Sequence, residues 1–357
     1  MSYSNQAVSA EQNEKNSFFL SLASVISAVA VVFMHVNGCF WNYSKASYWV
    51  SANVIESLMY FAVPVFFMIS GATLLDYQDR YDTKSFFKKR INKTVIPYVF
   101  WSTCGMVFYI LLNKASIKEV VLNKYIIRDI ISAKYVSVFW FFGPLFGVYL
   151  CMPVLASIEK SKKIAIYKYG IIVGVFFNIL MPFLVKFEKL DFLPVIISVT
   201  CVQGYLIFVL IGYVIFNSEI EKKNRYIVYC LAVIGFLLHV VGTYYLSVRD
   251  GEVNQTFKTY TNLPSLLYSS GVFLLFKEIT PIIMKRKHIV SVVNFLKKYT
   301  FAIYLLHWFI LNVIVRILKP TETSLIYRIA MPFAVILICC IVTILLRKIK
   351  IIGKLVP

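Results

Sequence analysis

The chain has 357 residues, of which 59% are hydrophobic and only 15% are charged. Soluble domains carry more charge, so this composition excludes an ordinary soluble fold and indicates a membrane protein. The net charge of +20 would favour nucleic-acid binding in a soluble protein, but no basic stretch lies on a domain that could present it to a duplex. We therefore predict no nucleic-acid partner.

Residues 17–38 form the first stretch that is long enough to cross a bilayer. A hydrocarbon core of about 30 Å needs about 20 apolar residues in a helix, and residues 18–37 supply them. The polar residues before this stretch lack the basic start of a secretory signal, so we expect the first helix to remain in the mature protein. It carries His35 near its far end, where the histidine is either functional or bonded at the membrane interface.

Further apolar spans predict an all-α, polytopic bundle of about ten transmembrane helices, and no loop between them is long enough for a folded domain. We expect one transmembrane domain at residues 17–346, a polar tail at 1–16 and a basic tail at 347–357. The predicted spans are 18–37, 53–75, 94–113, 137–156, 168–186, 195–217, 226–246, 263–280, 299–317 and 326–346.

The loops between these spans alternate in charge. If the N-terminus is cytoplasmic, the inner side holds 23 of the 37 Lys and Arg residues and the outer side about 11. This asymmetry is the positive-inside pattern, so both termini should be cytoplasmic. The loops 114–135 and 281–298 mix apolar with basic residues, and we expect each to lie along a face of the bilayer, the second against anionic lipids.

His35, Glu56, His239 and His307 are the ionisable residues deepest in the spans. The first helix should run outward and the second inward, which places His35 and Glu56 on the same side of the membrane. A carboxylate beside a histidine raises its basicity, which suits a general base. A structural polar contact between helices is the alternative.

A basic hairpin at residues 76–93 leads into the third span. Lys88, Lys89, Arg90 and Lys93 could bind a polyphosphate, because Lys and Arg supply charge and Arg can bond two oxygens at once. Their other interpretation is positive-inside charge alone.

Other chemistries find little support in the sequence. The seven cysteines show neither CxxC spacing nor a Cys/His cluster, so we predict no metal and no disulfide framework. The sequence contains no GxSxG elbow, no Walker loop and no HExxH motif.

Segments in matching order resemble the membrane acyltransferase family 3, and within it the surface-polysaccharide O-acyltransferase-like integral membrane proteins. They are AVAVVFMHVNGCF (28–40), VPVFFMISGATLL (63–75), FFKKRINKTVIPYVFW (86–101), FWFFGPLFGVYLCMPVL (139–155) and YTFAIYLLHWFIL (299–311).

This resemblance implies a multi-pass protein of the bacterial inner membrane that transfers an acyl group, commonly acetyl from acetyl-CoA, to a sugar hydroxyl. The acceptor would be an envelope polysaccharide or its lipid-linked precursor, with acyl-CoA as a donor substrate and no permanently bound cofactor. By the same resemblance His35 matches a histidine thought to act in catalysis, and Arg90 matches an arginine at the entry to the third helix. Many members have an arginine eleven residues before the histidine, where this chain has Ser24.

Tyr304 and His307 are three residues apart, and so lie on one face of the ninth predicted helix. They are candidates to line the substrate cavity, with core packing as the alternative. Two other functional classes stay open: a transporter that moves an acyl donor or a glycan without covalent chemistry, and the membrane-bound O-acyltransferases, which also place a histidine in an apolar helix.

Overall fold

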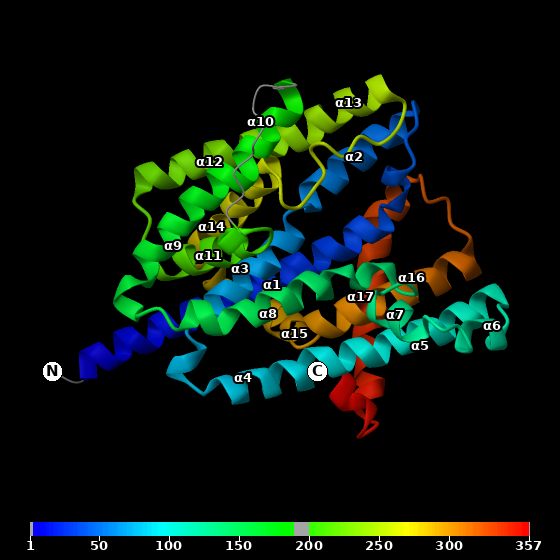
Figure 1. Ribbon diagram of the computed structural model, residues 1–357, viewed down its shortest axis with the longest axis horizontal. Helices are drawn as coiled ribbons and strands as arrows, with labels where there is room; N and C mark the ends of the chain where they lie inside the picture. The colour runs from blue at the N-terminus through cyan, green and yellow to red at the C-terminus, as the bar shows by residue number, and fades with distance from the viewer. Residues whose placement is uncertain (1–2, 189–199, 357) are drawn as a thin grey trace. The chain divides into compact units, whose positions relative to one another are not determined.

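The computed structural model describes residues 3–188 and 200–356, and the ordered elements in these ranges are all helical (Figure 1). Nine helical stretches in these ranges are long and apolar enough to cross a bilayer, so the chain is a multi-pass helical membrane protein, as its composition predicted. They are Glu11–Val36, Ser47–Asp79, Thr83–Asn113, Ser137–Ala156, Lys160–Val185, Lys222–Asp250, Leu263–Met284, Thr300–Leu318 and Leu325–Arg347.

The span predicted at 195–217 corresponds to α11 (Leu206–Asn217), an apolar helix of only 12 residues. Residues 195–199 of that prediction lie outside the described residues. The end of α11 is capped by a lysine: Lys277 Nζ donates hydrogen bonds to the carbonyls of Ile215 at 2.7 Å, Phe216 at 3.2 Å and Ser218 at 2.9 Å. These bonds satisfy carbonyls that a helix end otherwise leaves without donors.

The first helix, α1 (Tyr3–Val36), is longer than the predicted span. The polar residues before position 17 continue the helix because Ala, Gln and Glu are good helix formers. Two side-chain pairs one turn apart support this part, with 2.7 Å between Lys15 Nζ and Glu11 Oε1 and 3.1 Å between Gln12 Nε2 and Asn16 Oδ1.

The second predicted span is two helices, α2 (Ser47–Met59) and α3 (Ala62–Leu74). Pro64 explains the break, because it has no N–H for the carbonyl of Tyr60 and its ring would collide with that carbonyl in a continuous helix. Glu56 therefore lies on a separate short helix at one end of the span.

Three spans contain a π-helical turn: η3 (Ile91–Val95), η5 (Val175–Leu180) and η7 (Leu238–Gly242). A π turn inserts one residue into the helix and changes the direction of the side chains that follow, and such turns are frequent at functional sites. Arg90 directly precedes η3, and His239 lies within η7.

The chain forms two compact units. The first contains residues 1–75, 158–300 and 321–332, and the second contains 76–157, 301–320 and 333–357. Besides α1, α2, α3, α11, η5 and η7, the elements of the first unit are η1 (Gly38–Trp41), α9 (Lys160–Gly174), α10 (Met181–Glu188), η6 (Thr200–Val202), α12 (Lys222–Leu237), α13 (Thr243–Asp250), α14 (Leu263–Met284), α15 (Lys287–Lys297) and the start of α17 (Leu325–Arg347).

Besides η3, the second unit has the elements η2 (Tyr77–Asp79), α4 (Thr83–Arg90), α5 (Ile96–Asn113), α6 (Ile117–Val121), α7 (Ile126–Ile131), η4 (Ser137–Phe141), α8 (Phe142–Ala156), nearly all of α16 (Thr300–Leu318), the rest of α17 and η8 (Ile352–Leu355). Whether residues 17–346 act as one domain stays a prediction.

In the first unit, α3 and α11 lie against each other at backbone distance. A Cβ atom added at Gly71 would come within 1.9 Å of the Val209 carbonyl oxygen, and one added at Gly212 within 2.1 Å of the Met68 oxygen. Small residues at such contacts let two membrane helices pack closely. These two glycines therefore fix how deeply α11 is buried.

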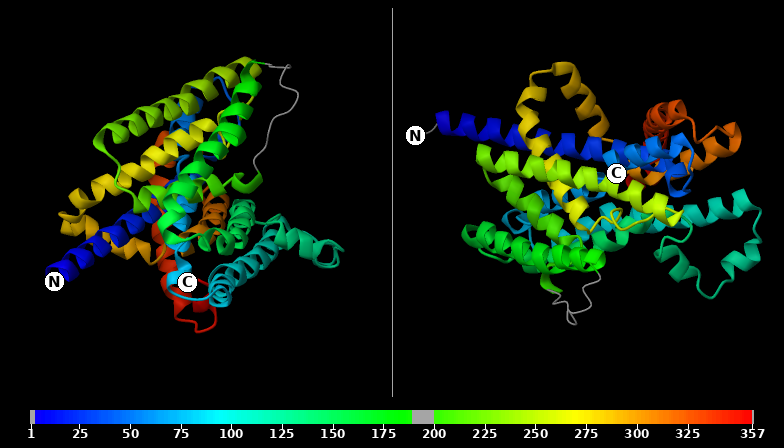
Figure 2. Two further views of the ribbon diagram at one scale, coloured as in Figure 1. Left: turned by 60° about the vertical axis from the view of Figure 1, so that its left-hand side comes forward. Right: turned by 90° about the horizontal axis from the view of Figure 1, so that it is seen from above.

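Most of the basic stretch 281–298 forms α15, which folds back from the end of α14 and packs on α1 (Figure 2). Val293 packs with Phe18, Leu22 and Val25 of α1, while Ile289, Val292 and Phe295 are exposed. One side of α15 is thus covered by α1 while apolar side chains on its other sides are exposed, and its position along the bilayer face stays a prediction.

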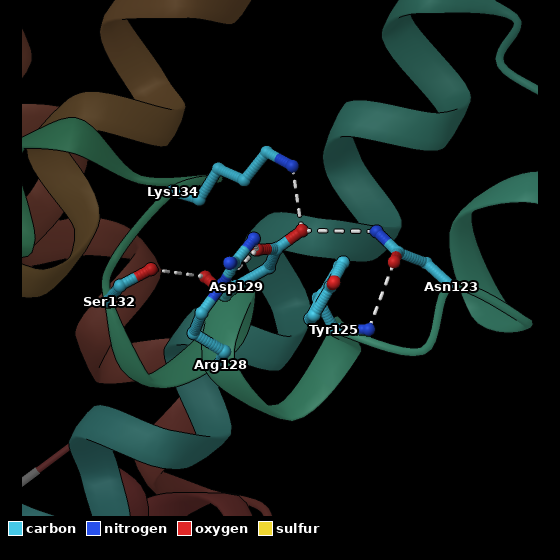
Figure 3. A network of polar contacts seen from close by, with 6 residues as sticks. All are labelled: Asn123, Tyr125, Arg128, Asp129, Ser132 and Lys134. Carbon is cyan, nitrogen blue, oxygen red and sulfur yellow. Dashed lines mark hydrogen bonds and ion pairs between the residues drawn. The ribbon is translucent and has the colours of Figure 1, made fainter.

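In the second unit, the loop 114–135 is organised by one carboxylate, that of Asp129 (Figure 3). It accepts hydrogen bonds from Lys134 Nζ at 2.6 Å, Arg128 Nη2 at 3.1 Å and Asn123 Nδ2 at 3.2 Å. The hydrogen bond from Lys134, helped by Arg128, holds the pKa of this carboxyl below its usual value. The charged form of Asp129 therefore ties α6, α7 and the residues after them together.

Candidate functional site

His35 lies in the last turn of α1 and is half-buried. The helix ends at Val36, and the chain turns through η1 into the loop before α2. Asn37, directly after the helix, is fully buried. The end of α1 thus carries an imidazole and a buried amide within three positions of each other.

Asn37 connects the end of α1 to the carboxylate of α2. Its Nδ2 donates to Glu56 Oε2 at 3.3 Å and to the Ala52 carbonyl at 2.9 Å. Glu56 is only 2% exposed. The structure therefore brings the segment that carries His35 to Glu56 through Asn37, and direct pairing of the two side chains stays a prediction.

Lys258 is a buried cation beside Glu56, on the loop between α13 and α14. It is 2% exposed, its Nζ donates a hydrogen bond to Ser57 Oγ, and the ammonium lies 5.2 Å from the centre of the Tyr60 ring. Burial lowers the pKa of Lys258 from 10.5 to about 7, and the attraction of Glu56 opposes this shift. The loop thus places a lysine of perturbed basicity next to a buried carboxylate.

Arg328 is the second buried cation near Asn37. It lies in the first turn of α17 and is 1% exposed. Its Nη1 donates to Asn37 Oδ1 at 3.4 Å, and its Nη2 donates to Ser51 Oγ at 2.8 Å and to the Thr323 carbonyl at 3.2 Å. Arg328 therefore ties the start of α17 to both α1 and α2.

We call the residues His35, Asn37, Glu56, Lys258 and Arg328 the α1-end cluster. All of them belong to the first unit. The sequence predicted His35 and Glu56 but did not predict that Lys258 and Arg328 are buried beside them. The available signal was that a lysine in an outer loop runs against the positive-inside pattern.

His239, another ionisable residue of the spans, is buried in η7 of the same unit. Its Nε2 lies 3.3 Å from Ser265 Oγ, and its ring centre lies 5.0 Å from that of Tyr60. Tyr60 in turn donates a hydrogen bond to the Lys258 carbonyl. His239 thus contacts Tyr60, which in turn binds the backbone of the loop that carries Lys258.

The predicted phosphate ligands lie at the junction of α4, η3 and α5 in the second unit. Asp82 caps α4 by accepting a hydrogen bond from the Ser85 N–H at 2.8 Å. Lys88, Lys89 and Lys93 are exposed, while Arg90 is half-buried. The four residues therefore do not share one environment.

Arg90 packs its guanidinium between two aromatic rings. Its Cζ lies 5.7 Å from the ring centres of both Phe86 and Tyr149. Its Nε is buried without a hydrogen-bond partner among the described residues. The guanidinium of Arg90 thus lies within cation–π distance of both rings, and its Nε donates no hydrogen bond among the described residues.

Tyr304 and His307 lie on α16 in the second unit, with ring centres 5.9 Å apart. The Tyr304 hydroxyl donates to the Val138 carbonyl, and its ring packs against Phe139 and Phe142. His307 is fully buried, with Nδ1 3.0 Å from the Ile303 carbonyl. These contacts agree with core packing, and a role in a substrate cavity stays a prediction.

The predicted catalytic pair and the predicted phosphate ligands belong to different units, and the role of each group stays a prediction. Among the described residues, no group of three His, Cys, Asp or Glu side chains could hold a metal ion.

A family model described as "Acyltransferase domain" matches residues 19–347, which is nearly the whole chain. No curated protein and no solved structure matches the chain.

Proposed function

The chain belongs to the membrane acyltransferase family 3, and from this premise we propose that it is an O-acyltransferase that moves an acetyl group from acetyl-CoA to a sugar hydroxyl. The acceptor in this proposal is a cell-envelope polysaccharide or its lipid-linked precursor, and the enzyme works in the inner membrane of a bacterium. Membership of this family makes the protein a membrane acyltransferase.

The α1-end cluster is the observation that carries the proposal. Burying a carboxylate, an ammonium and a guanidinium within a helical membrane protein is costly, and charges kept at such depth usually serve a function. Glu56, Lys258 and Arg328 lie around the end of the helix that carries His35. Of the four histidines, only His35 is half-buried and belongs to this cluster.

The reaction assigns His35 one of two roles. As general base, a ring nitrogen of His35 takes the proton of the sugar hydroxyl while the hydroxyl oxygen attacks the thioester carbonyl; the carbon–sulfur bond then breaks, and the CoA thiolate leaves. As nucleophile, the ring nitrogen itself attacks the thioester, CoA leaves, and the sugar oxygen takes the acyl group from the imidazole. In both roles the reaction takes place in the polar environment that Asn37, Glu56 and Lys258 provide.

The donor would bind through the basic residues at the entry to α5. CoA carries its phosphates at the nucleotide end, and Lys88, Lys89 and Lys93 are exposed on the hairpin that the charge pattern places in the cytoplasm. Arg90 adds a planar guanidinium that its aromatic neighbours hold in place, which suits two-oxygen recognition of a phosphate.

Comparison of surface-glycan acylation between a deletion strain and the wild type tests the function and identifies the acceptor. We expect the deletion to remove one O-acyl group from the glycan, and complementation with the wild-type chain, but not with His35→Ala, to restore it. Unchanged acylation in the deletion strain would contradict the proposal. If the deletion changed the uptake or export of the glycan but removed no acyl group, transport would be the better explanation.

A further inference from the structure

A pocket of about 250 Å³ with polar and apolar lining residues lies in the first unit and has no role in the mechanism above. Its walls come from three separate segments: the π turn η5 with the start of α10, the two residues after η6, and the end of the loop that carries Lys258. The lining residues are Phe177, Asn178, Ile179, Pro182, Gln203, Gly204 and Thr261.

The backbone of this pocket is held by specific contacts. Asn178 Nδ2 donates to the Val202 carbonyl at 2.8 Å, which joins η5 to η6. Gly204 has φ of +58°, a left-handed conformation that side chains rarely adopt, and it allows the chain to turn from η6 into α11. The pocket is therefore shaped by the fold and does not depend on a single side chain.

The lining residues offer hydrogen bonds without charge. The amide side chains of Asn178, whose Nδ2 also donates to the Val202 carbonyl, and of Gln203 have both donor and acceptor atoms, and the Thr261 hydroxyl can donate or accept. Phe177, Ile179 and Pro182 add apolar surface. Neighbouring hydroxyls of a sugar need donors and acceptors together, while a carboxylate or phosphate would meet no cation among the described residues that line this pocket.

The loop links this pocket directly to the end of α1. Thr261 follows Tyr260, whose hydroxyl lies 3.8 Å from Met34 Sδ and whose ring stacks on Tyr60 at 4.3 Å. Met34 directly precedes His35. Through the Tyr260 side chain, the loop segment that lines the pocket thus contacts the last turn of α1, which carries the predicted catalytic histidine.

We propose that this pocket binds an uncharged sugar ring of the acceptor and presents it to the α1 end. The proposal rests on the proposed function, because it names the subsite and the acceptor class of the same reaction. It assigns Asn178, Gln203 and Thr261 to the hydroxyl groups of the ring and Phe177 to its apolar face.

Saturation-transfer NMR with the purified full-length protein and no donor tests this directly. The probes are the methyl glycosides of glucose, galactose and N-acetylglucosamine, with methyl glucuronide as the charged comparison. We expect saturable binding of at least one neutral glycoside and none of the glucuronide. Thr261→Val and Gln203→Ala should each weaken binding about fivefold, the loss expected for one hydrogen bond.

Thr280→Val is the matched control, because the Thr280 hydroxyl bonds to the Phe276 carbonyl of its own helix and not to the pocket. The proposal is overturned if no neutral glycoside shows saturable binding, or if the glucuronide binds equally well. Both results come from the wild-type protein, so they do not depend on whether a variant folds. Hydrolysis of acetyl-CoA by the same preparation separates the two claims: sugar binding without thioester use removes the proposed function alone, and thioester use without sugar binding removes the pocket alone.

Discussion

His35 is the residue whose replacement should have the largest effect on activity and the smallest on folding. We expect His35→Ala to lower acyl transfer about 100-fold or more, the contribution of a general base or nucleophile, while the protein still accumulates in the membrane. The measurement is O-acyl content of the surface glycan at matched protein level.

His288→Ala is the control for this variant, because His288 is an exposed histidine on α15. It should acylate as the wild type does. Normal acylation by His35→Ala would rule out both chemical roles of His35.

Lys258 should make the stability of the protein depend on pH. Burial lowers its pKa to about 7 from 10.5, so between these values the unfolded chain binds more protons than the folded one. Stability then rises with pH across this window, by up to about 1.4 kcal/mol per pH unit. Lys258→Met removes this titration, so the difference in melting temperature between the variant and the wild type should change between pH 7 and pH 10.

Lys45→Met serves as the comparison, because Lys45 is exposed on another loop of the same unit. Its melting temperature should differ from that of the wild type by the same amount at every pH. A constant difference for Lys258→Met as well would mean that Lys258 does not titrate in this window.

The sequence shows which ionisable residues are energetically costly because they interrupt an apolar run. It does not show which residues lie close together in the fold. His35 and Glu56 stand out because each interrupts an apolar run, and a period of hydrophobic residues is visible in one dimension. Lys258 and Arg328 look like ordinary loop and helix-end charges. Both are buried against segments that are distant in the sequence: Lys258 Nζ donates to Ser57 Oγ, 201 residues away, and Arg328 Nη2 donates to Ser51 Oγ at 2.8 Å, 277 residues away.

The entry to α5 is the element on which donor recognition should depend. Arg90→Lys keeps the charge but loses the planar fork, so we expect the KM for acetyl-CoA to rise about tenfold at fixed protein level. Arg80→Lys, a conservative change in the same hairpin, should leave the KM unchanged. Equal KM values for Arg90→Lys and the wild type would mean that the basic residues serve only to keep the hairpin on the cytoplasmic side of the membrane.

The short helices α6 and α7 should loosen when Asp129 loses its charge. Asp129→Asn cannot pair with Lys134 and Arg128, so trypsin should cleave after Lys124 and Arg128 several-fold faster than in the wild type. Glu119→Gln, an exposed change on α6, should not alter the rate. Because the pKa of Asp129 is lowered, its stabilising effect is present above pH 3.8 and is lost as the pH falls through the lowered value.

Sequence periodicity located the elements better than it located their interruptions. The break between α2 and α3 follows from Pro64, which was visible in the sequence but lies in an apolar run that reads as one span. The π turns could not be predicted, because they leave the hydrophobic pattern intact and arise from packing. The short α11 had the same apolar signal as a full span, since burial by protein and burial by lipid select similar residues.

The orientation of the whole molecule in the membrane rests on the charge asymmetry of its loops. In a background without native cysteines, we expect a cysteine at Gln255 to react with an impermeant maleimide in intact cells and one at Gln78 to react only after lysis. Both positions are exposed in the structure, so access is limited by the membrane and not by the fold. Reversed labelling would place the hairpin, and with it the donor, on the outer side.

The close contact of α11 with α3 has a consequence for how the protein is made. A helix of twelve residues is about 18 Å long, well short of the thickness of the hydrocarbon core. The short α11 is therefore poorly suited to enter the bilayer as an independent span. It needs α3 already in the bilayer as a partner, with Gly71 and Gly212 providing the surface on which it settles. A bulky residue at either glycine would then be seen first as a failure of biogenesis, with a chain degraded before it could ever meet its substrates.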